Sequence, residues 1–158
     1  MSLDPNRPDL TVGVLGTGAM GRGIAQVAAA GGIHILMMDA RAGAAQEARD
    51  FIGKMLLRAA EKGSMTHVDA QAALGRIKIV NALADFKPCH ALIEAVAEDL
   101  GVKRQVFGEL EALVAPDCIL ATNTSSLSVT MIATKLKTPQ RFAGLHFFNP
   151  APLMRLVE

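Results

Sequence analysis

Short runs of apolar and β-branched residues alternate with longer stretches of helical periodicity along the whole chain. The short runs predict β-strands over Leu10–Leu15, Ile33–Met38, Ile77–Val80, Ala91–Glu94, Ile119–Thr122, Phe142–Phe147 and Leu153–Val157. The periodic stretches predict a first helix through Ile24, Ala25, Val27 and Ala28, and further helices over about 41–62, 66–74, 101–114 and 128–135. Strands that alternate with helices are typical of a mostly parallel sheet covered on both faces, so we expect a doubly wound α/β fold.

Glycines and a capping pattern mark where the predicted helices end and begin. Gly31 and Gly32 would stop the first helix as a left-handed cap does, and Gly63 ends the second. Thr66, with Asp69 three residues later, resembles a capping box at the start of a third helix. Two consecutive helices are more than one crossover between parallel strands needs, so we predict a helical hairpin insertion that projects from the sheet.

Length and composition favour one globular domain. The chain has 158 residues, of which 51% are hydrophobic and 20% charged, with a formal net charge of +1. These values exclude a disordered tail and give no sign of a nucleic-acid partner. The longest apolar stretch, Val27–Met38, is interrupted by glycines and falls short of the roughly 18–20 residues of a membrane span. Residues 1–9 lack the features of a signal peptide and are interpreted as a leader before a domain over residues 10–158.

Cysteines and histidines are too few and too dispersed to predict a disulfide framework or a metal site. Cys89 and Cys118 are each flanked by apolar segments, which favours buried free thiols in a reducing cytoplasm. The chain has no Cys-x-x-Cys or His-x-x-x-His pair that could begin a metal cluster. We therefore expect a cytoplasmic protein that carries no metal ion.

A glycine-rich turn lies between the first predicted strand and the first predicted helix. Its residues are Gly16, Thr17, Gly18, Ala19, Met20 and Gly21. Gly16 would allow the tight turn, Gly18 would let the backbone approach a pyrophosphate, and Gly21 would let helix and strand pack closely. Free N–H groups at the helix N-terminus suit phosphates. The turn could merely join strand to helix, but the strand–turn–helix–strand–Asp pattern favours the dinucleotide site of a Rossmann fold.

Asp39 indicates which dinucleotide is bound. It lies 18 residues after Gly21, at the end of the second predicted strand. A carboxylate there can accept hydrogen bonds from both hydroxyls of an adenosine ribose, and it would repel the 2′-phosphate of NADP. Arg41 favours the opposite choice, because an arginine nearby can accommodate that phosphate. On balance the predicted cofactor is NAD.

Three segments of the second half carry polar residues in a distinctive order. They are Ile93–Asp99 with Lys103, Thr122–Leu127, and Leu145–Pro150 followed by Val157 and Glu158. Together with the glycine turn, these motifs closely resemble the NAD-binding domain of the L-3-hydroxyacyl-CoA dehydrogenases, a family that includes the bacterial 3-hydroxybutyryl-CoA dehydrogenases. The sequence His-Phe-Phe-Asn-Pro is the most distinctive of them, and the resemblance runs from about Leu10 to Glu158.

The resemblance implies an enzyme of fatty-acid β-oxidation that oxidises the 3-hydroxyl of a (3S)-hydroxyacyl-CoA and passes hydride to NAD. It implies that His146 is the catalytic histidine and that Glu158 pairs with it. Ser125 and Asn149 match polar residues near the substrate oxygen and the nicotinamide. A solitary histidine in an apolar strand is more often structural, and Ser125 could instead cap the next helix, although Ser128 is the better candidate for that cap.

The resemblance also implies ligand contacts away from the reacting atoms. Glu98 and Lys103 match residues that contact the nicotinamide-side ribose, and Asn123 matches a further cofactor contact. Lys62, at the end of the long helix, falls where the family has a lysine facing the coenzyme A portion of the substrate. Without the resemblance, Glu98 with Lys103 would be interpreted as a solvated pair at a helix end, and Lys62 as a solvated lysine.

Elementary chemistry supports the same histidine and glutamate. A carbinol loses hydride only as its O–H proton is removed, so a base with a pKa near neutrality is needed, and histidine fits best. A carboxylate on the other ring nitrogen fixes the tautomer and stabilises imidazolium. Glu158 lies 12 residues beyond His146. If the last two predicted strands are adjacent, the turn between them can bring the two side chains together.

Family members carry a further helical domain, which closes over the substrate and forms a homodimer, and the chain shows no sequence for it. We therefore expect this chain to bind NAD while turning over little or no substrate alone. Two alternatives stay open. The glycine turn also resembles that of the 3-hydroxyisobutyrate dehydrogenase group, whose members act on hydroxy acids and would not need His146 with Glu158. The chain could also be a non-catalytic NAD-binding module.

Overall fold

The computed structural model describes residues 3–158. Within them, six strands form one sheet in the order β3-β2-β1-β4-β5-β6, and every neighbouring pair is parallel. The strands are β1 (Thr11–Leu15), β2 (His34–Met38), β3 (Ile77–Ile79), β4 (Ala91–Glu94), β5 (Ile119–Thr122) and β6 (Phe142–Gly144). This strand order is that of the Rossmann fold, which confirms the predicted doubly wound α/β architecture.

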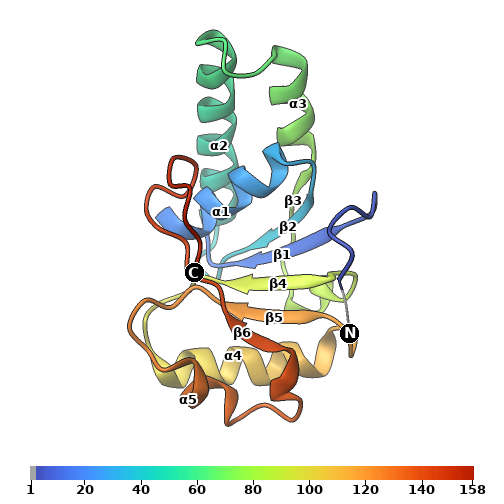
Figure 1. Cartoon of the computed structure of the whole chain (residues 1–158), viewed down its shortest axis with the longest axis vertical. Helices are drawn as coiled ribbons and strands as arrows, with labels where there is room; N and C mark the ends of the chain where they lie inside the picture. The colour runs from blue at the N-terminus through green and yellow to red at the C-terminus, as the bar shows by residue number, and fades with distance from the viewer. Residues whose placement is uncertain (1–2) are drawn as a thin grey trace.

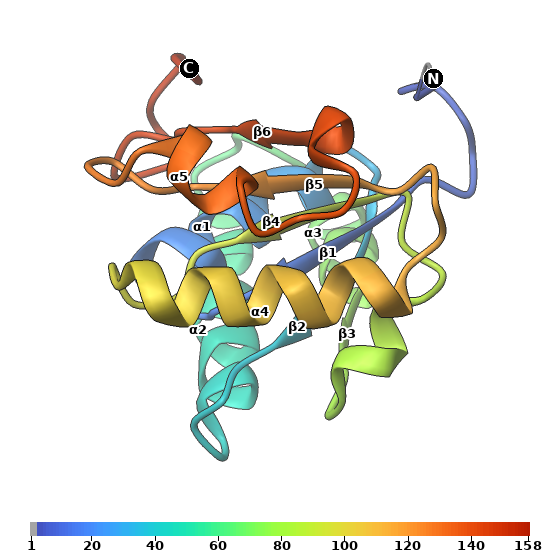
Figure 2. The same ribbon diagram turned by 90° about the horizontal axis from the view of Figure 1, so that it is seen from below.

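Helices cover both faces of the sheet. They are α1 (Ala19–Ala30), α2 (Ala44–Glu61), α3 (His67–Gly75), α4 (Leu100–Leu113) and α5 (Val129–Ala133), with 3₁₀ turns at Leu83–Phe86 and Pro139–Arg141. Figure 1 shows α1, α2 and α3 on one side of the strands and α4 and α5 on the other. Figure 2 views the molecule from the α4 side, where this helix lies in front of the sheet and runs in roughly the same direction as β5 and β6.

Each face of the sheet has its own hydrophobic core. On β1, Val12 and Val14 belong to the cluster under α1, α2 and α3, whereas Leu15 belongs to the cluster under α4. On β4, Ile93 and Leu92 divide between the two clusters in the same way, because successive side chains of a strand point to opposite faces. Burial on both faces explains why the strands appear in the sequence as nearly continuous apolar runs.

The predicted helical hairpin is present and consists of α2 and α3, which project beyond the sheet in Figure 1. Gly63, with φ +73°, lies in the turn after α2. Thr66 is the N-cap of α3, and its Oγ1 accepts a hydrogen bond from the backbone N–H of Asp69 at 3.0 Å, as the capping pattern predicted. Local sequence signals therefore define the insertion.

The start of α2 differs from the prediction, which placed it at residue 41. The helix begins at Ala44. The backbone N–H of Arg41 donates to the Asp39 carboxylate at 2.9 Å, and Gly43 adopts the left-handed conformation with φ +80°. The left-handed conformation of Gly43 is incompatible with an uninterrupted helix from residue 41, so residues 41–43 belong to the turn that follows β2.

The two strands predicted at the C-terminal end were wrong in extent. Strand β6 ends at Gly144 instead of Phe147, and residues 153–157 form no strand. The N–H of Phe147 donates to the side-chain Oδ1 of Asn123 at 2.8 Å instead of to a neighbouring strand. Pro150 and Pro152 have no N–H to donate, so the segment turns away from the sheet.

A short antiparallel contact replaces the predicted strand pair. The N–H of His146 donates to the carbonyl of Glu158 at 2.6 Å, and the N–H of Glu158 donates to the carbonyl of His146 at 2.9 Å. The two residues therefore face each other directly across this backbone pair. The expectation that the turn brings them together is confirmed, although by one pair of hydrogen bonds and not by two full strands.

Other predictions from composition concern the chain ends, the cysteines and possible membrane or metal sites. Residues 1–2 of the predicted leader lie outside the described residues, and residues 3–9 form turns ahead of β1. Cys89 and Cys118 are free and buried, as predicted, and burial raises the pKa of their thiols to about 12 and about 11.

Within residues 3–158, no helix has the length and apolarity to cross a membrane. In the same residues, no three His, Cys, Asp or Glu side chains form a group that could hold a metal ion.

Candidate functional site

The predicted site residues gather at the edge of the sheet where the strands end at their carboxyl termini. The glycine turn follows β1, Asp39 follows β2, the loop with Glu98 follows β4, and the loop with Ser125 follows β5. Between β1 and β4 the strand order reverses direction, and this crevice is where open parallel sheets bind ligands.

The glycine turn is packed so tightly that two of its positions exclude any side chain. Gly16 has φ +92°, and a Cβ there would lie 2.5 Å from the backbone oxygen of Ala95. A Cβ on Gly21 would lie 1.8 Å from the backbone oxygen of Gly16. Both contacts involve backbone atoms, which cannot rotate aside, so these two glycines are required by the fold itself.

Gly18 differs, because a Cβ at this position would meet nothing within 4 Å. Gly18 is the N-cap of α1 in an extended conformation, and no side chain caps the helix. The first turn of α1 contains no acidic residue. Open space before uncapped N–H groups and a positive helix terminus is the environment that a pyrophosphate requires, so these residues fit a dinucleotide.

Asp39 is held in place by the glycine turn. Its Oδ2 accepts hydrogen bonds from the N–H and the hydroxyl of Thr17 at 2.7 and 2.8 Å, and its Oδ1 accepts one from the N–H of Arg41. Burial opposes the charge on Asp39, but the hydrogen bonds from Arg41 and Thr17 outweigh it and lower the pKa of the carboxyl. The carboxylate is therefore ionised and oriented before any ligand arrives.

A cavity of about 580 Å³ extends from Asp39 and the glycine turn between the ends of β1, β2 and β4. Its lining also includes the apolar side chains of Val96, Val102 and Val106. A cavity lined by both a carboxylate and apolar side chains suits an adenosine, whose ribose is polar and whose base is flat and weakly polar. Thr17, predicted as a cofactor contact, lines this cavity while its hydroxyl is bound to Asp39.

Lys103 is buried, so the alternative interpretation of Glu98 with Lys103 as a solvated pair at a helix end is wrong for the lysine. It is 1% exposed, and its Nζ donates to Oε1 of the fully buried Glu94 at 2.6 Å. Its other polar contacts are Oε2 of Glu98 at 3.3 Å and the backbone oxygen of Val96 at 3.4 Å. Glu94 was missed by the sequence analysis, although a charged residue ending an apolar strand signals a need for a buried partner.

Glu98 joins the loop after β4 to the loop after β5. Its Oε1 accepts hydrogen bonds from the hydroxyl of Thr124, the N–H of Ser125, and the N–H and hydroxyl of Ser126. Burial opposes the charge, but the bonds from Thr124 and Ser126, with Lys103 nearby, lower the pKa of Glu98 to about 2. We call this arrangement of Glu98 with residues 124–126 the loop clasp.

The loop clasp fixes the position of Ser125. Ser125 is exposed, and its backbone N–H belongs to the clasp. Helix α5 is capped instead by Ser128, whose Oγ accepts the N–H of Met131 at 3.3 Å. The alternative role of Ser125 as a helix cap is therefore wrong, and its side chain stays a candidate for contacts to a ligand.

His146 and Glu158 form the candidate acid–base pair. His146 Nδ1 lies 3.8 Å from Glu158 Oε2, and the two side chains are 28% and 64% exposed. The imidazole also packs against the ring of Phe148, with centroids 4.7 Å apart. The bond from the N–H of Phe147 to Asn123 holds this segment against the end of β5. Asn123, predicted as a cofactor contact, therefore also positions the neighbour of His146.

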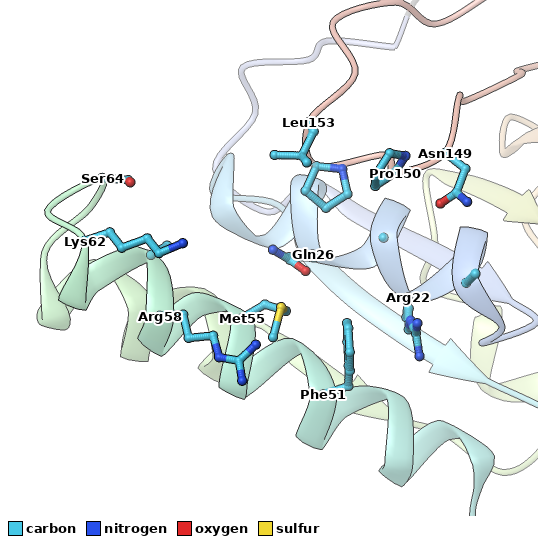
Figure 3. A pocket seen from close by; sticks show the side chains of 14 residues that line it. Arg22, Gln26, Phe51, Met55, Arg58, Lys62, Ser64, Asn149, Pro150 and Leu153 are labelled. Atoms are coloured by element: carbon cyan, nitrogen blue, oxygen red, sulfur yellow. The ribbon is translucent and has the colours of Figure 1, made fainter.

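Lys62 and Asn149 lie at opposite sides of a second cavity, of about 530 Å³ (Figure 3). Helices α1 and α2 and residues 149–153 form its walls. Arg22 and Arg58 add two cations that the sequence analysis missed. Arg58 could have been found, because residues four apart on a helix lie on one face.

Apolar side chains form the wall on α2 between these cations. Phe51 and Met55 point into the cavity from this helix in Figure 3. The guanidinium of Arg22 lies 3.9 Å from the centroid of the Phe51 ring, a cation–π contact that orients it. The cavity thus combines positive charge with apolar surface, which suits an anionic ligand with a hydrophobic portion.

Comparisons with known proteins agree with this geometry. Residues 11–158 match the family described as "3-hydroxyacyl-CoA dehydrogenase, NAD binding domain". The chain is 42% identical over 145 residues to a probable 3-hydroxybutyryl-CoA dehydrogenase of Bacillus subtilis, covering 92% of this chain and 50% of that protein. It is 43% identical over 148 residues to the 3-hydroxyadipyl-CoA dehydrogenase of Escherichia coli, covering 94% of this chain and 31% of that protein.

A solved structure shows the same fold. The crystal structure of a 3-hydroxybutyryl-CoA dehydrogenase from Escherichia coli K12 superposes with a TM-score of 0.92 at 42% identity, over 94% of this chain and 31% of that chain. The chain therefore spans half or less of the length of these relatives.

Proposed function

The chain belongs to the family of 3-hydroxyacyl-CoA dehydrogenase NAD-binding domains, and we propose that it provides the cofactor site and the catalytic base of an enzyme that oxidises (3S)-3-hydroxyacyl-CoA to 3-oxoacyl-CoA. One observation carries the proposal: the His146–Glu158 pair adjoins the carboxyl edge of the sheet that also holds the glycine turn and Asp39. Ala19 of the glycine turn and Asn149, three residues after His146, line the same cavity, which supports placing cofactor and base in one site.

The cofactor of the family is NAD, which when bound supplies the hydride acceptor. In our proposal, the N–H groups after Gly18 bind its pyrophosphate and Asp39 accepts the hydroxyls of the adenosine ribose. Glu98, held by Lys103, and Asn123 with Ser125 then face the nicotinamide half. The open space at Gly18 and the preoriented carboxylate of Asp39 support this assignment.

His146 is the proposed base. Its imidazole removes the proton from the 3-hydroxyl, and Glu158 holds the ring and stabilises the imidazolium that forms. The side chains of Ser125 and Asn149 donate hydrogen bonds to the substrate oxygen as it becomes a carbonyl. The backbone pair between His146 and Glu158 supports this role, since it keeps base and carboxylate together without depending on their side chains.

The proposed substrate is an acyl-CoA, whose phosphates and long thioester arm match the cavity beside α2. Lys62 and Arg58 supply positive charge at its mouth, and Phe51 and Met55 supply apolar contact. The two relatives named above act on different acyl groups according to their names, so we propose the 3-hydroxyacyl-CoA class and no single chain length. For the whole protein, we propose a cytoplasmic homodimer of fatty-acid metabolism, which the family resemblance supports.

The proposal can be tested in a chimera. Residues 11–158 would replace the matching half of the Bacillus subtilis relative, and NADH-dependent reduction of acetoacetyl-CoA would be followed by the loss of NADH absorbance. We expect turnover within about tenfold of that relative, and none in the same chimera with Gly18→Val. A folded chimera that binds NADH and acetoacetyl-CoA but transfers no hydride would contradict the proposal.

A further inference from the structure

We propose that Glu47 is a second determinant of cofactor choice, because its ion pair with Arg41 closes a latent site for the 2′-phosphate of NADP beside Asp39. The inference rests on NAD binding at the glycine turn and extends it to the first turn of α2. It concerns a question that the sequence leaves open, since Asp39 and Arg41 favour opposite cofactors.

Arg41 is in the right place to bind a 2′-phosphate. Its backbone N–H donates to Oδ1 of Asp39 at 2.9 Å, so its backbone lies beside the carboxylate that faces the adenosine ribose. Arg41 also lines the cavity of about 580 Å³ together with Asp39. A guanidinium is the best side chain for a phosphate, because its planar fork donates two parallel hydrogen bonds.

The guanidinium is, however, engaged by Glu47. Arg41 Nη2 lies 2.6 Å from Glu47 Oε2 and Nη1 lies 3.2 Å from Oε1, which is the same two-pronged arrangement that a phosphate would use. Backbone hydrogen bonds hold the turn that brings Arg41 and Glu47 together. The N–H of Ala44 donates to the carbonyl of Arg41, and the N–H of Glu47 donates to the carbonyl of Gly43. Glu47 therefore competes directly for the bonds that a phosphate needs.

Space for the phosphate exists next to this pair. A depression of about 340 Å³ lies between the turn after β2 and the end of β3, and Asp39 and Arg41 line it as well as the larger cavity. Asn81 contributes a side-chain amide that could donate a hydrogen bond, whereas the amide of Gln46 already donates to Asp50 Oδ1 at 2.8 Å. The depression is large enough for a phosphate and offers hydrogen-bond donors, so charge is what excludes the phosphate. The two negative charges of Asp39 and Glu47 exceed the single positive charge of Arg41.

The ion pair between Arg41 and Glu47 is also exposed enough for a phosphate to replace Glu47. The side chains of Arg41 and Glu47 are 64% and 66% exposed, so the bond between them is weakened by solvent and does not lock the fold. A phosphate with two negative charges can replace the single charge of Glu47 once repulsion from Asp39 is removed. Asp39 and Glu47 together, and not Asp39 alone, are thus expected to set the preference for NAD.

The test is calorimetric titration of the chain with NADH and with NADPH, which measures binding without any turnover. The variants are Asp39→Ser, Asp39→Ser with Glu47→Gln, and the latter with Arg41→Ala. The matched control is Asp39→Ser with Asp50→Asn, because Asp50 carries the same charge on α2 and bonds Gln46 instead of Arg41.

We expect wild type to bind NADH more tightly than NADPH. Adding Glu47→Gln to Asp39→Ser should tighten NADPH binding by about tenfold, because one repulsive charge is lost and one guanidinium becomes free. Arg41→Ala should remove this gain, and Asp50→Asn should change NADPH binding by less than about twofold.

Two results would overturn the inference while leaving the proposed function intact: no gain from Glu47→Gln beyond that from Asp50→Asn, or a gain that survives Arg41→Ala. Failure of wild type to bind NADH would instead refute the cofactor site itself and, with it, this inference. A thermal melt of each variant shows that it is folded before titration.

Discussion

Two glycines of the same turn are expected to fail in different ways when they are substituted. Gly21→Ala places a Cβ 1.8 Å from the backbone oxygen of Gly16, where neither atom can rotate aside. Gly18→Val places its side chain in open space, in an extended conformation that valine adopts readily. The first substitution should therefore damage the fold, and the second should mainly damage cofactor binding.

The magnitudes follow from these contacts. Overpacking against backbone should cost Gly21→Ala roughly 3 kcal/mol or more, which lowers Tm by about 6 °C or more in a domain of this size. Gly18→Val loses a fair N-cap residue, at a cost of roughly 0.5–1 kcal/mol. It should nevertheless weaken NADH binding by at least about a hundredfold, because the side chain occupies the space of the pyrophosphate.

Thermal melts and NADH titrations of the chain measure both effects. Gly108→Ala is the matched control, since Gly108 lies in α4, away from the cofactor cavity, and its added Cβ also meets nothing within 4 Å. It should raise Tm slightly and bind NADH as wild type does. A folded Gly18→Val variant with normal NADH affinity, or a Gly21→Ala variant with an unchanged Tm, would refute the reasoning.

Three further predictions follow from the site. Lys103→Met leaves Glu94 buried without its cation and should lower the free energy of unfolding by about 3–5 kcal/mol, and an unchanged denaturation midpoint would show that the pair is not needed. Because the pKa of Glu98 is lowered to about 2, the loop clasp should contribute its full stability above the ordinary glutamate pKa near 4.5 and lose it as pH falls toward 2. Glu98→Gln should therefore flatten the dependence of Tm on pH between these values. A pH dependence like that of wild type would contradict the role of Glu98 in the clasp. The chain alone should reduce acetoacetyl-CoA at less than about one hundredth of the rate of the Bacillus subtilis relative, and comparable rates would show that residues 1–158 suffice.

Much of the fold could be predicted from sequence because its signals are local. The glycine turn, the apolar runs of β1 to β5 and the capping pair Thr66 and Asp69 each specify their own element. The C-terminal segment was mispredicted because its outcome depends on distant partners. Asn123 takes the N–H of Phe147, and this competition cannot be recognised from residues 142–157 alone.

The site shows the same division between local and distant signals. Asp39 was predicted from motif spacing and the His146–Glu158 pair from the family resemblance, and in the structure Asp39 lies at the glycine turn and His146 beside Glu158. The burial of Lys103 depends on Glu94, nine residues earlier on another element, so the local sequence suggested a solvated helix end. Arg41 is the clearest case, because only the structure shows that Glu47 occupies its guanidinium.

We propose that His146 is the base of an NAD-linked 3-hydroxyacyl-CoA dehydrogenase. The most direct test is the turnover number of the chimera described above with His146→Gln, compared with His34→Gln as a matched control at the opposite edge of the sheet. We expect a loss of roughly a hundredfold or more for His146→Gln with NADH affinity retained, and a near-normal rate for His34→Gln. Full turnover in the His146→Gln chimera would show that His146 is not the base.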